Sequence, residues 1–152
     1  MKNKLTFEGK RVHGIALGGI CLLYIASLFL PALDTGKDSF LGQLPGYAIL
    51  LYGWSGIYLY IYDWIANICF FLGVFFLFRK IYGLGLIYAF CAILISLQTV
   101  MLDWQLNNAS QHISFYLSLK NLMVGFYVWE LSFIFLLVYC YLNLPKKHKV
   151  KV

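Results

Sequence analysis

Two carboxylates lie in the most apolar parts of this sequence. Asp63 is set into "YLYIYDWIANICFF", residues 58 to 71, and Glu130 into "FYVWELSFIF", residues 126 to 135. Carboxyl groups in membrane-buried segments usually face the protein interior, pair with other polar groups and mark proton or ion sites. The chemistry to consider is therefore the binding of a proton, a cation or a small polar solute.

Residue counting places further polar side chains near the depth of these two acids. At 1.5 Å per residue, Asp63 and Asn67 lie about 24 and 18 Å from the basic end of their apolar segment, and Glu130 lies about 21 Å from the same side. Gln98 and Ser27 follow at about 25 and 24 Å. We predict one polar layer in the outer half of the bilayer. A hydrogen-bonded layer that fixes helix register is favoured over a ligand site, and both interpretations stay open.

The tetrapeptide "LDTG", Leu33 to Gly36, matches the catalytic loop of aspartic proteases. That chemistry needs two carboxylates sharing a proton on a β-scaffold. Here Asp, Thr and Gly follow an apolar segment, where they are ordinary turn formers. We interpret the motif as a coincidence in a short extracellular loop.

The cysteines and histidines form no ligand pattern. One cysteine lies in each apolar segment, without a CxxC pair, and the histidines are scattered. These residues are Cys21, Cys69, Cys91 and Cys140, with His13, His112 and His148. We expect no metal, because buried cysteines commonly act as small hydrophobes. We also expect no cofactor and no enzyme activity. An enzyme using Asp63, Glu130 and His112 is the weakest alternative, since nothing in the spacing brings His112 to the acids.

Composition defines the class of protein that must position these residues. The 152 residues are 62% hydrophobic and only 12% charged, against roughly a quarter charged in soluble domains. This indicates an integral membrane protein, and the continuous apolar runs favour helices over a barrel. We predict an all-α protein with four transmembrane helices, each near the roughly 20 residues that a crossing needs. The expected helices cover residues 12–33, 58–78, 82–102 and 121–144.

Residues 44–78 are too long for one crossing, at about 52 Å if helical. Pro45-Gly46, Gly53 and Gly56 interrupt the stretch, so we predict an interfacial or re-entrant segment over 46–57 before the second helix. One long tilted helix is the alternative. The single membrane domain then has an extracellular loop over 103–120 and a basic tail over 145–152.

Orientation follows from the basic residues. Ten of the twelve Lys and Arg residues flank one side of the four segments, within 2–11, 79–80 and 146–151. The positive-inside rule therefore predicts cytoplasmic N- and C-termini. The first segment lacks a small-residue cleavage site and is expected to stay as a helix. The net charge of +6 reflects this topology and attraction to anionic lipid, with no case for nucleic acid.

Small residues at four-residue spacing predict helix-packing faces. Gly14 and Gly18 form a GxxxG in the first segment, and Ala92 and Ser96 repeat the spacing in the third. Such pairs let helix backbones approach closely.

The ordered set "SLFLPAL", "LPGYAILLYGWSGI" and "DWIAN" resembles a group of small four-span bacterial inner-membrane proteins of uncharacterised activity. The resemblance covers roughly residues 27 to 70 and implies topology and an inner-membrane location. The matching positions are Pro45, Gly46, Gly53, Trp54, Trp64, Ala66 and Asn67.

The expected function is a non-catalytic interaction or accessory protein that binds another membrane protein or itself, as a homo-oligomer in the lipid bilayer. The short loops, the packing faces and the absence of catalytic motifs favour it. The alternative is a small transporter or channel that uses the carboxylate layer.

Overall fold

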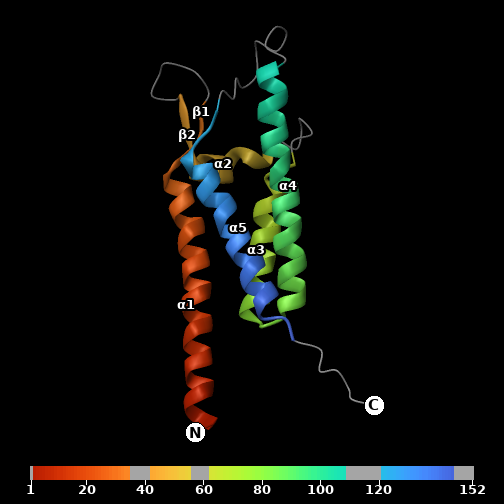
Figure 1. Cartoon of the computed structure of the whole chain (residues 1–152). Coiled ribbons are helices and arrows are strands. Elements are labelled where there is room, and N and C mark those ends of the chain that lie inside the picture. Colours follow the sequence, from red (N-terminus) through yellow and green to blue (C-terminus); the bar gives the residue numbers. More distant parts are fainter. Residues whose placement is uncertain (1, 35–41, 56–61, 109–120, 146–152) are drawn as a thin grey trace, which may run out of the picture.

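The chain forms a helical bundle that is closed at one end by a small sheet and a short helix (Figure 1). The computed structural model describes residues 2–34, 42–55, 62–108 and 121–145, with side chains over 12–34, 42–55, 62–100 and 122–145. The elements in chain order are α1 (Lys2–Phe29), β1 (Pro31–Asp34), β2 (Gln43–Pro45), α2 (Gly46–Tyr52), α3 (Ile65–Phe78), α4 (Tyr82–Asn108), β3 (Asn121–Leu122) and α5 (Val124–Leu142).

Within the described residues, three helices are long and apolar enough to cross a membrane. Their apolar stretches are Val12–Phe29 in α1, Tyr82–Val100 in α4 and Val124–Leu142 in α5. The expected predominantly helical fold is therefore confirmed, with three helices that are candidates for membrane spans. Because Pro31 has no backbone N–H and disfavours helix in the residue before it, α1 stops at Phe29 instead of reaching residue 33.

The second expected span differs most from the prediction. α3 has 14 residues and begins at Ile65, so it is about 21 Å long. α2 ends at Tyr52 and Tyr62 is not helical, which rules out one helix over 44–78. At the other side, α4 continues to Asn108, into the segment that was expected to be a loop.

The core lies where α3, α4 and α5 meet, and α1 packs mainly along α5 (Figure 1). α3 and α4 approach each other closely at two glycines: a Cβ on Gly85 would lie 3.4 Å from the Gly73 carbonyl oxygen. Ala92 and Ser96, predicted as a packing pair, are both fully buried. The fully enclosed large side chains in this core are Phe70, Leu77, Phe133, Leu136 and Cys140.

One end of the bundle, which we call the sheet end, carries a three-stranded antiparallel sheet in the order β2-β1-β3. No strand was predicted here, and the expected loop at "LDTG" is wrong for Leu33 and Asp34, which lie in β1. Asp34 lies opposite Gln43 and Asn121. Its register partners are therefore amides and not the second carboxylate that a protease would need. Residues 35 and 36 lie outside the described part.

We call the opposite end the basic end, because the exposed Arg79 and Lys80 form the turn between α3 and α4 there. The start of α1 and the end of α5 lie at the same end (Figure 1). Lys80 has a φ of 59°, and the amides of Lys80 and Ile81 donate to carbonyls of the last turn of α3 at 2.9 Å. This is a Schellman turn with lysine where glycine is usual.

Candidate functional site

Asn67 is the most completely bonded of the predicted layer residues. It is 5% exposed, and its Oδ1 accepts hydrogen bonds from the Tyr24 hydroxyl at 2.8 Å and from the Trp129 indole Nε1 at 2.9 Å. Its Nδ2 donates to the Trp64 carbonyl oxygen at 3.2 Å. Because Tyr24 belongs to α1 and Trp129 to α5, this Asn67 group (Tyr24, Asn67 and Trp129) joins three helices.

Aromatic rings enclose the Asn67 group. The Tyr24 ring stacks on Phe70 at 4.5 Å with an interplanar angle of 11°. Trp129 meets Phe133 edge-on at 4.6 Å, and Phe70 and Phe133 lie 5.2 Å apart. Because apolar rings surround the hydrogen bonds of this group, the bonds are strong, and breaking one costs free energy by leaving a buried polar atom unpaired. The group therefore fits the structural interpretation of the layer.

Asp63 occupies a different place from the one expected. It lies in the turn before α3, and its carbonyl oxygen accepts from the Ala66 amide at 3.0 Å. Its Oδ2 accepts from the Thr99 hydroxyl of α4 at 2.6 Å, while the buried Oδ1 has no partner. An acid at a helix N-terminus interacts favourably with the helix dipole. That position gives a local reason for a carboxylate in an apolar sequence.

Gln98 and Trp64 hold the chain where it enters α3. The Gln98 Oε1 accepts from the Tyr62 amide at 3.1 Å, which ties this entry to α4. The Trp64 Nε1 donates to the Leu50 carbonyl oxygen of α2 at 2.7 Å. A Cβ on Gly53 would lie 3.0 Å from the Trp64 ring, so the end of α2 packs against the start of α3.

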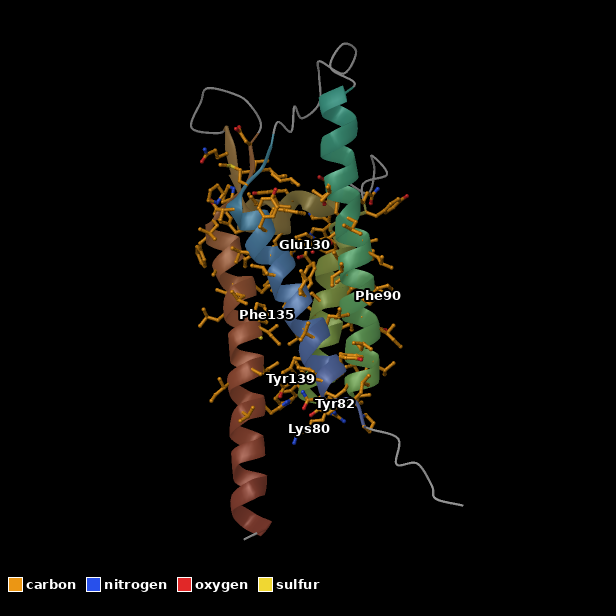
Figure 2. All side chains as sticks on the ribbon, viewed as in Figure 1. Lys80, Tyr82, Phe90, Glu130, Phe135 and Tyr139 are labelled. Atoms are coloured by element: carbon orange, nitrogen blue, oxygen red, sulfur yellow. The ribbon has the colours of Figure 1, made fainter. Side chains whose placement is uncertain are left out.

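Glu130 lies inside α5, in the half of the bundle nearer the sheet end (Figure 2). Its carboxyl group hydrogen-bonds Ser96 of α4, and its buried Oε1 has no partner. The Ser96 hydroxyl also reaches the Ile93 carbonyl oxygen at 2.8 Å. A serine has one proton to donate, so it cannot donate to both groups at once.

Ser27 does not join the other members of the layer. Its hydroxyl donates to the Tyr24 carbonyl oxygen of its own helix at 2.6 Å, as serines in helices often do. The predicted layer therefore divides into the Asn67 group and a second set of residues, in which Ser96 and Thr99 of α4 bind the side chains of Glu130 and Asp63. We call these four residues the carboxylate cluster. Tyr24, Trp129 and Thr99 were not predicted. Counting their depth as for the other residues would have indicated the first two, at about 20 and 22 Å.

The two predicted packing pairs have opposite surroundings. Ala92 and Ser96 are enclosed by the bundle, whereas a Cβ built on Gly14 or Gly18 has nothing within 4 Å. The exposed α1 residues Ile15, Leu22 and Ile25 belong to the same lightly covered helix. This side of α1 is an apolar surface with two glycines and no partner among the described residues.

No group of three His, Cys, Asp or Glu residues able to hold a metal exists within the described residues. The four cysteines are free thiols. His13 Nδ1 lies 3.1 Å from the Tyr139 hydroxyl, and its ring meets Tyr82 edge-on. Tyr82 and Tyr139 lie at the basic end with Lys80 (Figure 2). His112 and His148 lie outside the described part.

Comparison with known proteins gives this chain no relatives: no protein-family profile, no curated protein and no solved structure matches it. The resemblance to small four-span inner-membrane proteins stays a prediction.

Proposed function

We propose that this protein is a non-catalytic membrane protein that binds a further membrane helix through α1. In this proposal α1, α3, α4 and α5 all cross a bacterial inner membrane, and α2 lies in the outer interface. The turn between α3 and α4, which contains Arg79 and Lys80, lies at the same end as the start of α1 and the end of α5 (Figure 1). By the positive-inside rule, this basic end is cytoplasmic.

The open glycine side of α1 carries the proposal. Inside the bundle, Gly73 and Gly85 allow α3 and α4 to approach each other closely. Gly14 and Gly18 are equally small, but nothing lies within 4 Å of a Cβ built on either of them. Glycine costs about 1 kcal/mol relative to alanine in a helix, and in membrane helices it is typical of close helix contacts.

α1 is also the least enclosed of the three long helices. Of its apolar stretch 17% is buried, compared with 28% in α4 and 33% in α5. The partner is a transmembrane helix of a second copy or of another membrane protein. Both sources offer the same surface chemistry, and the experiment below separates them.

Cys21 provides a probe for this contact. It is half-buried and follows Gly14 by seven residues, which is two turns along the same side of α1. Oxidative cross-linking in the source membrane is expected to give a product that Cys21→Ser abolishes and Cys91→Ser retains. A product of twice the mass of the chain identifies a second copy, and another mass identifies a different protein.

Two glycine variants test the surface itself. Gly18→Leu fills the open side of α1 and should remove most of the cross-linked product. Gly83→Leu is the matched control, because a Cβ on Gly83 also has nothing within 4 Å but lies on α4. The absence of a Cys21-dependent product, or equal yields from both leucine variants, would contradict the proposal.

A second candidate function is a proton or cation pathway through the carboxylate cluster, which contains Asp63 and Glu130. The buried oxygens Asp63 Oδ1 and Glu130 Oε1, which lack partners, favour it. Because the Ser96 proton can satisfy the Ile93 carbonyl oxygen, Ser96 can accept a hydrogen bond from a protonated Glu130. Intramembrane acids with such freedom are typical of proton relays.

Flux into liposomes distinguishes this candidate. Asp63→Asn and Glu130→Gln should each reduce proton or cation flux at least tenfold. Ser132→Ala is the control, since the Ser132 hydroxyl donates only to the Trp129 carbonyl oxygen of its own helix. Flux that is absent from the wild type, or equal in all variants, excludes the candidate.

A further inference from the structure

Contacts near both ends of the bundle mark two levels at which its helices are held together. At the basic end, His13 of α1 meets the Tyr139 hydroxyl of α5 at 3.1 Å, and the Tyr82 ring lies edge-on to His13 with ring centres 6.2 Å apart. α1, α4 and α5 are therefore level with one another at these three residues.

At the sheet end, a second set of contacts fixes the upper level. Gly46 packs on the backbone of Ser27 and Leu28, which places the start of α2 at the last turn of α1. A Cβ on Gly125 would lie 2.8 Å from the Leu30 carbonyl oxygen. This contact holds the start of α5 at the same end. Thr99 of α4 holds Asp63 before α3.

The helical distance between the two levels is short. From His13 to Leu28, α1 rises about 23 Å, and from Tyr82 to Thr99, α4 rises about 26 Å. α5 rises about 21 Å from Gly125 to Tyr139, and the 14 residues of α3 also rise about 21 Å. Tilt reduces these values further, and α5 is visibly inclined to α1 (Figure 1). A typical hydrocarbon layer is ~30 Å thick.

Side-chain chemistry marks the same two boundaries. Among the described residues, five of the six exposed Tyr and Trp residues lie at the sheet end, and the sixth, Tyr141, lies at the basic end with the exposed Arg79 and Lys80. Aromatic and basic residues anchor helices at the two membrane interfaces. The exposed Tyr and Trp residues at the sheet end are Tyr47, Tyr52, Trp54, Tyr62 and Tyr127. Between the boundaries the surface is apolar, as Phe90 and Phe135 illustrate (Figure 2).

From these contacts we infer that the protein is fitted to a thin bilayer, with a hydrocarbon layer of about 21 to 26 Å. Its preferred lipids are phospholipids with short acyl chains, and in a thicker membrane the adjacent lipid must thin, most of all beside α3. A mismatch costs fractions of a kcal/mol per Å. The inference is independent of any partner of α1.

Reconstitution into phosphatidylcholine vesicles of graded chain length tests this fit. With monounsaturated chains of fourteen to twenty-two carbons, the midpoint temperature of thermal unfolding should be highest at fourteen or sixteen. It should fall by about 5 °C or more at twenty-two. A maximum at eighteen carbons or longer, or no dependence on chain length, would overturn the inference.

Two double variants test whether the aromatic residues set the boundary. Tyr62→Leu with Trp54→Leu removes two exposed rings near the start of α3, so the optimum should move to longer chains. Phe90→Leu with Phe135→Leu makes the same chemical change in the middle of the apolar surface and should leave the optimum in place. If the chain length of highest stability does not change in the first double variant, or changes equally in both, the result counts against the inference.

Discussion

The sheet end and the basic end of the bundle are held together in different ways. At the sheet end, the Asn67 group joins three helices through two bonds to one oxygen, and Gly125 packs directly on the backbone that follows α1. At the basic end, α1 meets α5 through the His13–Tyr139 pair. Gly14 nearby has open space around it.

This difference agrees with the proposed function, in which the sheet end stabilises the bundle and α1 binds a partner helix. The buried polar groups lie toward the sheet end, where neighbouring elements fix their positions. The open surface of α1 extends toward the basic end, where few contacts would have to break for a partner helix to dock. A substitution that disturbs the sheet end should therefore act on stability, and one on the α1 surface should act on binding.

The largest expected effect comes from a matched pair of glycines. In Gly125→Ala the new Cβ would lie 2.8 Å from the carbonyl oxygens of Leu30 and Pro31, so backbone must move and stability should fall by about 3 kcal/mol. In Gly14→Ala the Cβ meets nothing, and higher helix propensity should raise stability by up to about 1 kcal/mol. Unfolding in mixed detergent micelles measures both. Equal losses would erase the contrast between the two ends.

Asn67→Leu is expected to cost somewhat less, about 2 kcal/mol, because it leaves the Tyr24 hydroxyl and the Trp129 indole without an acceptor. Tyr24→Phe removes one donor and should cost about 1 kcal/mol. The same unfolding assay applies, with Ser132→Ala as a control that breaks only a bond within one helix. If Asn67→Leu proved neutral, the sheet end would not depend on its polar core.

The apolar stretches of α1, α4 and α5 could be predicted because each is continuous and close to the length of a membrane crossing. Counting depths singled out Asn67, and the structure bonds it to Tyr24 and Trp129, which were not in the predicted layer. Aromatic residues are common in membrane helices, so nothing in their type alone distinguished these two from lipid-facing ones.

The start of α3 and the sheet could not be predicted for physical reasons. Residues 58–62 are as apolar as the helix that follows. The hydropathy of the sequence therefore does not change at Ile65, where α3 begins. The strands have two to four residues, which is too short for a period-two pattern to show. Their pairing depends on Gly46 and Gly125 packing against the end of α1, which are contacts distant in sequence.

A smaller contrast is expected between the two acids. Asp63→Asn replaces the carboxyl group at the N-terminus of α3 and should cost about 0.5 to 1 kcal/mol. Glu130→Gln keeps the shape of a side chain whose Oε1 has no partner, so stability should change by less than about 0.5 kcal/mol. A double-mutant cycle of Asp63→Asn with Thr99→Val measures the 2.6 Å contact. A larger loss for Glu130→Gln than for Asp63→Asn would reverse the assignment of structural roles.

The smallest change in stability is expected for substitutions of Lys80, in the turn between α3 and α4. Lys80 holds a left-handed backbone conformation with a φ of 59°, which costs a non-glycine residue roughly 1 to 2 kcal/mol. Lys80→Gly relieves this strain but gains freedom in the unfolded chain, so the net stabilisation should be about 0.5 kcal/mol. Lys80→Ala loses the same charge and keeps the strain, so the difference between the two variants isolates the backbone contribution. If the alanine variant unfolds at the same detergent composition as the glycine variant, the turn is not strained, and the basic end is less different from the sheet end than its geometry indicates.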